Sequence, residues 1–124
     1  MSRFTKSEDG KAVTDTLTGL VWSQNTVASD VTFEDAVKAV EALGEGWRLP
    51  TVDELQTIVD RTKYDPAIDT EAFPDTESDC YWTSTPCAWR PESARWVAYF
   101  YDGDVYGHGG FLNYACVRAV RGGQ

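Results

Sequence analysis

Hydrophobic and polar positions divide the chain into an early β-prone part, a helical middle and a late β part. From Arg3 to Trp22 the sequence is rich in β-formers, with turn signals at Asp9-Gly10 and Thr18-Gly19. Leu20 to Trp22 forms a short apolar strand after the second turn. Apolar residues then recur at helical spacing, which predicts an amphipathic helix that begins after Thr32 and ends before Gly44. Its apolar face consists of Phe33, Ala36, Val37, Val40 and Leu43.

A second helix is predicted directly after Pro50. Thr51 and Glu54 have the T-x-x-E spacing of a capping box, in which side chains and backbone satisfy each other at a helix start. Leu55, Ile58 and Val59 supply its apolar face, and the pattern ends near Asp60. Residues 61–79 contain two prolines and many acids and predict a long loop. Loops of this length are uncommon in a compact domain and often carry function.

The last third of the chain has the alternation of β-strands. Strands are predicted over Tyr81–Thr85 and Arg95–Tyr101, with a turn at Asp102-Gly103 and a return strand from Val105. Within the second of these strands Trp96, Ala98 and Phe100 face one side, and Val97, Tyr99 and Tyr101 face the other. A last short strand is predicted over Val117–Val120. Helices followed by a sheet predict an α+β fold.

Composition limits the classes of function. The chain has 124 residues, which predicts a single domain over 1–124, and 42% of its residues are hydrophobic. A formal charge of −9 argues against nucleic acid and anionic membranes as partners. No apolar run is long enough to insert into a bilayer, and the start of the sequence lacks the apolar core of a signal peptide. We therefore expect a cytoplasmic or phage-associated protein, or one whose signal lies outside this chain.

Cys80, Cys87 and Cys116 make an odd number of cysteines, so at most one disulfide can form within the chain. No C-x-x-C pair exists, and a zinc site would need ligands from scattered positions. Free or partly buried thiols are therefore the expectation.

Four sequence motifs occur in the same order as in one known family. They are Thr18-Gly19-Leu20-Val21-Trp22, Trp47-Arg48-Leu49-Pro50-Thr51 with Glu54-Leu55, Tyr81-Trp82-Thr83-Ser84-Thr85, and Val117-Arg118-Ala119-Val120-Arg121-Gly122-Gly123. The chain resembles the family typified by the C-terminal domain of the Legionella collagen-like adhesin. The resemblance covers nearly the whole chain. It implies a C-type-lectin-like fold, with two helices packed on small antiparallel sheets and a ligand surface on the later sheet and its loops.

The chain departs from this family in its cysteines. Members often carry one cysteine near Val40 and another at Ala119, and both are absent here. Loss of both halves of an implied disulfide fits folding in a reducing compartment.

Several motif residues have a structural explanation. The tryptophans Trp22, Trp47, Trp82 and Trp96 are expected in the core, because large aromatic side chains dominate small cores. The guanidinium groups of Arg48 and Arg118 are expected to pair with carboxylates such as Glu54, or to bind backbone carbonyls.

Catalysis finds little support in the residues. His108-Gly109-Gly110 is similar to the oxyanion segment of α/β-hydrolases, but the G-x-S-x-G nucleophile elbow is missing. A Cys–His pair could form from Cys87 or Cys116 with His108, although no spacing favours it. The lectin-like fold is shared with formylglycine-generating oxidases, which are much larger. We expect no enzyme and no cofactor.

A calcium site is also weakly supported. Asp102, Asp104 and Gly107 match part of an EF-hand loop, but Tyr106 and Asn113 stand at the fifth and twelfth positions, where ligands are required. The glutamate-proline-asparagine sugar motif of calcium-dependent lectins is missing too. No metal is predicted.

Residues 99–116 are rich in tyrosine, glycine and short polar side chains, and this composition predicts a ligand-binding surface. Tyrosine offers a large contact area with few rotors, and short polar side chains add adaptable hydrogen bonds. An ordinary hairpin with one exposed face explains the same composition. The loop 86–92 is expected to assist, with Trp89 and Arg90 as an anchor pair. The remaining predicted ligand-binding residues are Tyr99, Tyr101, Asp102, Asp104, Tyr106, His108, Phe111, Asn113 and Tyr114.

The resemblance suggests two kinds of recognition. C-type-lectin-like domains serve as variable proteins of diversity-generating retroelements, in which adenine mutagenesis scatters residues near the C-terminus. The nine predicted binding residues between Tyr99 and Tyr114, together with Cys116, are compatible products of that process. The alternative is a fixed adhesin module that binds carbohydrate or glycosaminoglycan, although the charge of −9 opposes an anionic glycan. Catalysis is a third alternative. The ligand is a protein or a glycan, and the oligomeric state is not predicted.

Overall fold

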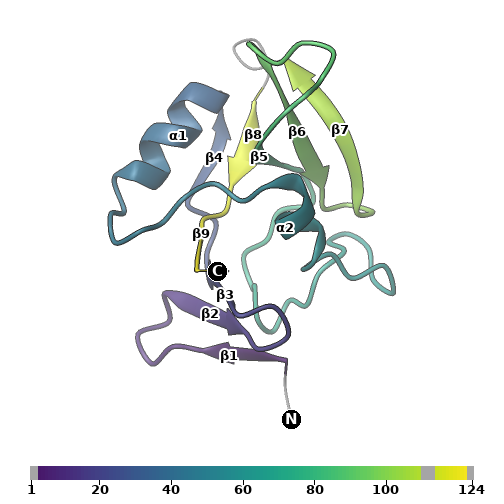
Figure 1. The fold of residues 1–124 in the computed structure, drawn as a ribbon. Helices are drawn as coiled ribbons and strands as arrows, with labels where there is room; N and C mark the ends of the chain where they lie inside the picture. The colour runs from purple at the N-terminus through teal and green to yellow at the C-terminus, as the bar shows by residue number, and fades with distance from the viewer. Residues whose placement is uncertain (1–2, 110–113, 123–124) are drawn as a thin grey trace.

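The computed structural model describes residues 3–109 and 114–122 and shows an α+β fold with two sheets (Figure 1). The first sheet has the order β1-β2-β3-β9, and the second has the order β4-β8-β5-β6-β7. The strands of the first sheet are β1 (Phe4–Lys6), β2 (Ala12–Asp15), β3 (Leu20–Ser23) and β9 (Val120–Gly122). Those of the second are β4 (Ala28–Val31), β8 (Ala115–Val117), β5 (Cys80–Pro86), β6 (Ala94–Tyr99) and β7 (Asp104–Gly109).

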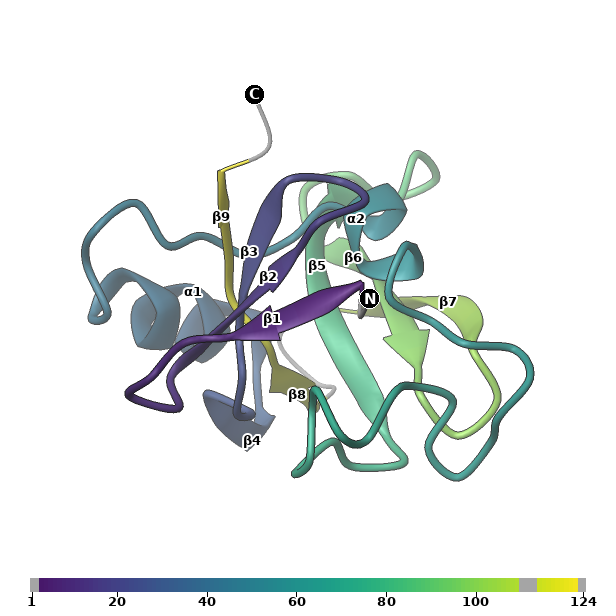
Figure 2. The same cartoon turned by 90° about the horizontal axis from the view of Figure 1, so that it is seen from below.

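The predicted turns of the first sheet are confirmed. Gly10 (φ 71°) lies in the turn between β1 and β2, and Gly19 (φ 79°) lies between β2 and β3. Both positive φ values are ones that glycine adopts without steric cost. Figure 2 shows β9 beside β3, with which it pairs antiparallel, so the two ends of the chain share one sheet.

Both predicted helices are confirmed. In α1 (Phe33–Glu41), the hydroxyl of Thr32 accepts the N–H of Asp35. In α2 (Val52–Gln56), the complete capping box of Thr51 and Glu54 is present. This second helix is shorter than the sequence predicts. The N–H groups of residues 57–59 bond to carbonyls three residues back, which tightens the chain into turns before Asp60.

The prediction of small antiparallel sheets is correct for the first sheet only. In the second sheet β5 and β8 pair in parallel, with Tyr81 opposite Cys116. The predicted strand over Val117–Val120 is also wrong. The chain leaves the second sheet after Val117 and enters the first at Val120, because Arg118 and Ala119 form the crossing between the sheets.

Arg118 is fully buried at this crossing, and its expected role as a structural residue is confirmed. Its guanidinium donates to the carbonyls of Ser23 and Gln24 at 2.6 and 2.9 Å and to the Thr76 hydroxyl at 2.8 Å. The Asp75 carboxylate lies 3.9 Å away. Burial lowers the pKa of Arg118, but these acceptors hold the cation in place and join β3 to the long loop.

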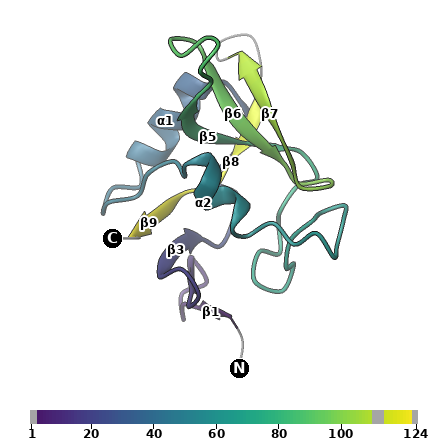
Figure 3. The ribbon, with the colours of Figure 1, turned by 45° about the vertical axis from the view of Figure 1, so that its right-hand side comes forward.

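The long loop predicted between α2 and β5 is confirmed, because no helix or strand lies within 61–79. Figure 3 shows it running beneath the second sheet as a teal-to-green coil. Ala67, Ile68, Ala72 and Phe73 are buried, so the loop contributes to the core rather than lying on the surface.

The core divides into two clusters on opposite faces of the second sheet. Tyr81, Ala98 and Phe100 belong to the cluster that contains Leu55 of α2, whereas Trp82 and Val97 belong to the one that contains Ala36 and Val40 of α1. The predicted alternation along β6 is therefore confirmed.

Tryptophan burial is partly as predicted. Trp22 and Trp82 are fully buried, but Trp47 and Trp96 are only half-buried. The Trp47 ring covers the surface instead, with the Arg121 guanidinium 4.6 Å from its centroid. Ala119 lies in one cluster with Val40, and both are buried.

Candidate functional site

Four tyrosine rings form a continuous row at the hairpin between β6 and β7. Tyr101 stacks on Tyr99 with ring centroids 5.9 Å apart, and Tyr99 lies 6.1 Å from Tyr106. Tyr64, from the loop after α2, meets Tyr101 edge-on at 6.1 Å. We call these four residues the tyrosine row. Aromatic pairs at this separation favour each other, so the rings stabilise one arrangement.

Strand register explains why the row lies on one face. Val97 pairs with Tyr106 and Tyr99 pairs with Asp104, and residues directly opposite in an antiparallel pair share a face. The two strands therefore present Tyr99, Asp104 and Tyr106 together. This is the face on which α1 packs further along the sheet, since Val97 and Trp82 lie in the cluster of α1.

Gly103 seats the hairpin on the rest of the molecule. Its φ of 89° requires glycine, and an added Cβ would lie 2.6 Å from Cγ1 of Val59. The Arg61 guanidinium donates to the Gly103 carbonyl at 3.3 Å, and the Asp65 N–H donates to the Tyr101 carbonyl at 2.8 Å. The hairpin that carries the row is thus fixed by close packing and by hydrogen bonds.

The rings of the row are held in place and yet open to solvent. Tyr64, Tyr101 and Tyr106 are 72%, 41% and 45% exposed, and Tyr99 is half-buried. Tyr81 shows the contrast, because it is fully buried and its hydroxyl bonds Thr26 and the N–H of Glu77. The exposure of the tyrosine row is therefore specific to these residues and is not shared by every tyrosine of the protein.

The row lies in an acidic environment. Partial loss of solvent raises the pKa of Tyr99 and Tyr106, and the nearby carboxylates of Asp102, Asp79 and Asp104 raise it further. Asp104 also accepts a long hydrogen bond of 3.4 Å from the Tyr106 hydroxyl. The hydroxyls of Tyr99 and Tyr106 consequently remain protonated donors at neutral pH.

His108, one of the predicted ligand-binding residues, is only partly exposed. It lies in β7, half-buried, with its ring edge-on to the buried Trp82 at 5.4 Å. Arg95 is its partner across the strands. His108 shares the face of the row but is fixed against the core.

The three cysteines are free thiols, as expected, and none is an activated nucleophile. Burial raises the pKa of Cys116 to about 12 and that of Cys80 to about 11, and it raises that of Cys87. A nucleophilic thiol needs the opposite shift. Cys116 is also 1% exposed within the core, which corrects its place among the residues free to vary at a surface.

The other predicted binding residues are scattered. Gly107 faces away from the row, and a Cβ on it would lie 2.8 Å from Cζ2 of Trp89, so Trp89 covers the opposite side of β7. Trp89 and Arg90 are exposed but do not join the row. Tyr114 is 56% exposed beside β8, with β5 and β6 between it and β7. Phe111 and Asn113 lie outside the described residues.

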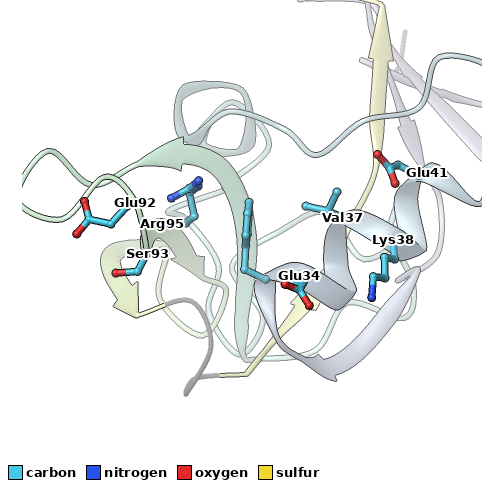
Figure 4. A pocket seen from close by; sticks show the side chains of 8 residues that line it. Glu34, Val37, Lys38, Glu41, Glu92, Ser93 and Arg95 are labelled. Carbon is cyan, nitrogen blue, oxygen red and sulfur yellow. The ribbon is translucent and has the colours of Figure 1, made fainter.

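A groove between α1 and the β5–β6 connection lies on the same face of the second sheet as the tyrosine row (Figure 4). It encloses about 400 Å³, and the Arg95 guanidinium lies 4.7 Å from the centroid of the Phe33 ring in its floor. We call it the α1 groove. Its lining residues are Phe33, Glu34, Val37, Lys38, Glu41, Glu92, Ser93 and Arg95. Phe33 and Val37 belong to the predicted apolar face of this helix, and their partial exposure shows that the groove leaves that face incompletely covered.

Metal ligands do not converge in the described part of the chain. No group of three or more histidine, cysteine, aspartate or glutamate side chains is placed to hold an ion there. Within the same residues, neither helix is long and apolar enough to cross a membrane.

Comparison with models of known protein families identifies the family of the chain. The model of the Lcl C-terminal domain family matches residues 11–121. The chain belongs to this family, that of the C-terminal domain of the Legionella collagen-like protein. No curated protein matches the chain. The four motifs that carried the resemblance lie in or beside β3, α2, β5 and the crossing from β8 to β9, so they form the Lcl C-terminal domain scaffold rather than its tyrosine row.

Proposed function

We propose that this chain is a non-enzymatic recognition domain of C-type-lectin-like fold, a single domain over 1–124, and that it binds its ligand through the tyrosine row. The observation that carries the proposal is a row of four rings that is open to solvent and yet fixed on a packed hairpin. Membership of the Lcl C-terminal domain family agrees with a ligand-binding role.

The physical argument rests on preorganisation. Binding costs conformational entropy for each side chain that becomes ordered, so rings already held by their neighbours lose less freedom. Tyrosine side chains combine apolar area with a hydroxyl donor, as protein paratopes do. Monomeric proteins rarely leave such aromatic area exposed without a role in interaction.

The variable protein of a diversity-generating retroelement is the finer form of this proposal. Tyr101, Asp102, Asp104 and Tyr106 are exposed, and none of them lies in a core cluster, so substitutions there would leave packing intact. His108 and Cys116 do not fit this description, because the first packs on Trp82 and the second is buried. A fixed adhesin module for neutral carbohydrate is the alternative.

Binding to peptide and glycan arrays tests the proposal. The triple variant Tyr99→Ala/Tyr101→Ala/Tyr106→Ala should lose every ligand that the parent binds. Tyr114→Ala is the control, because Tyr114 is also an exposed tyrosine but lies away from the row, and this variant should keep the ligands. Equal binding by the triple variant and the parent would place the ligand surface elsewhere.

Sequencing the 3′ end of the gene and its flanks from many cells separates the two finer forms. A nearby near-copy that differs mainly at adenines, beside a reverse-transcriptase gene, would establish diversification. An invariant 3′ end without such a copy would leave a fixed recognition module.

A further inference from the structure

We infer that the tyrosine row takes a basic segment of a partner protein, with lysine or arginine side chains lying over its rings. This inference rests on the proposed function and specifies the chemistry of the ligand. It is argued from the charges that surround the row and from the way the chain uses its other aromatic rings.

The surroundings of the row carry an excess of negative charge. Four carboxylates lie on or beside it, from Asp65, Asp79, Asp102 and Asp104, and two basic residues, Arg61 and Lys63, lie on the adjoining loop. Arg61 already donates to the Gly103 carbonyl under the hairpin. The ring faces are therefore bordered by acids, which repel sulfated or phosphorylated ligands and attract cations.

Elsewhere the chain covers aromatic rings with its own arginines. The guanidinium groups of Arg3, Arg95, Arg118 and Arg121 lie 4.6 to 5.7 Å from ring centroids. The rings concerned are Phe4, Phe33, Phe73, Tyr81 and Trp47. All five contacts lie outside the row. Tyrosine faces attract cations through their quadrupole, so the row offers faces that a partner can fill.

The position in the sheet suits a polypeptide ligand. β7 is the end strand of the five-stranded sheet, and its exposed residues Asp104 and Tyr106 lie at that edge. Tyr64 and Tyr101 extend the row past the hairpin turn onto the loop. A surface that is open and elongated, rather than a closed pocket, accommodates several side chains of an extended segment at once.

Titration of the full chain with a short arginine-rich peptide tests this inference. Backbone amide NMR spectra and tyrosine ring signals report where the peptide binds. A glutamine-rich peptide and a glutamate-rich peptide of the same length are the ligand controls. We expect shifts at residues 64 and 99–106 with the arginine peptide, weakened by added salt, and none with the glutamate peptide.

Substitutions separate the contributions of ring and charge. Tyr99→Leu/Tyr106→Leu keeps apolar bulk but removes the ring faces, and it should weaken binding by about tenfold. Tyr106→Phe keeps the ring and should bind within about twofold of the parent. Asp102→Asn/Asp104→Asn should weaken binding by about tenfold, whereas Glu8→Gln/Asp53→Asn, which removes two exposed acids elsewhere, should not.

Two outcomes would overturn the inference. One is an absence of shifts at the row with about 1 mM arginine peptide, the weak end of measurable affinity. The other is binding that survives both the leucine and the asparagine variants. If the array ligands whose binding requires the tyrosine row are neutral or acidic, the inference of a cationic ligand is wrong, but the proposed function stands. If no hit depends on the row, the proposed function fails as well.

Discussion

At the scale of single residues, exposure separates the aromatic side chains that stabilise the fold from those available to a ligand. Trp82 and Tyr81 are fully buried with their polar atoms bonded, since the Trp82 indole N–H donates to the Val31 carbonyl at 2.9 Å. Tyr101 and Tyr106 are open, and their side chains contact neighbouring rings and, for Tyr106, the Asp104 carboxylate.

Trp82 and Trp96 are both expected in the core from the sequence alone, but their replacement should lower the free energy of unfolding by different amounts. Trp82→Ala empties a core site beside Phe33 and should cost about 3–5 kcal/mol of unfolding free energy. Trp96→Ala should cost less, about 1–2 kcal/mol, because Trp96 is half-exposed. Chemical denaturation of both variants measures the difference. Equal losses would show that Trp96 is a core residue, as the sequence alone suggested.

At the scale of elements, the hairpin turn depends on Gly103. Gly103→Ala adds a Cβ 2.6 Å from Val59 at a φ of 89°, so strain and overlap should together cost about 2–4 kcal/mol. Gly10→Ala is the matched control. Gly10 has a φ of 71° but no atom within 4 Å of the added Cβ, so about 1 kcal/mol is expected. Similar losses in thermal unfolding would mean that contact with Val59 does not seat the hairpin.

The start of α2 should make stability depend on pH. Hydrogen bonds from Arg48 at 2.7 and 2.8 Å are the main cause that lowers the pKa of Glu54 below its usual 4.5. A lowered pKa means that the folded state favours the carboxylate, so this stability is present above pH 4.5 and is lost as the pH falls further. Glu54→Gln should cost about 1 kcal/mol at pH 7, because the pair is partly exposed.

Denaturation at several pH values measures this contribution. The difference between the parent and Glu54→Gln should shrink between pH 5 and pH 3, because acid protonates the parent carboxylate as well. A difference that stays constant with pH would exclude the ion pair as its source.

At the scale of the whole molecule, binding and folding are assigned to different residues. The triple variant Tyr99→Ala/Tyr101→Ala/Tyr106→Ala should melt within about 5 °C of the parent, since the row lies outside both core clusters. Thermal unfolding followed by circular dichroism measures this. Collapse of the fold would show that the row is a part of the core.

Local signals in the sequence predicted most of the elements. Capping residues and apolar spacing located α1 and the start of α2, and alternation located β6 together with its two faces. The pairing of strands that are distant in the sequence could not be predicted from such local patterns. Arg118 and Ala119 carry the chain from one sheet to the other, and no local pattern distinguishes such a crossing from a continuous strand.

The candidate site was predicted in part. Its tyrosines and aspartates on the hairpin followed from composition, but Tyr64 joins the row only through the fold of the long loop. Trp89 and Arg90 looked suitable in the sequence, yet the glycine at 107 admits Trp89 on the opposite side of β7. Which face a loop side chain covers depends on tertiary packing that spacing along the chain does not encode.

Hydrogen–deuterium exchange of the domain with and without the tightest ligand from the arrays tests the central claim most directly. The tyrosine row and the α1 groove lie on the same face of the sheet but involve different segments, so exchange distinguishes them. We predict protection in the segments 60–66 and 98–107, with residues 33–41 and 91–95 unchanged. Protection confined to the α1 groove, with the hairpin unchanged, would contradict the account.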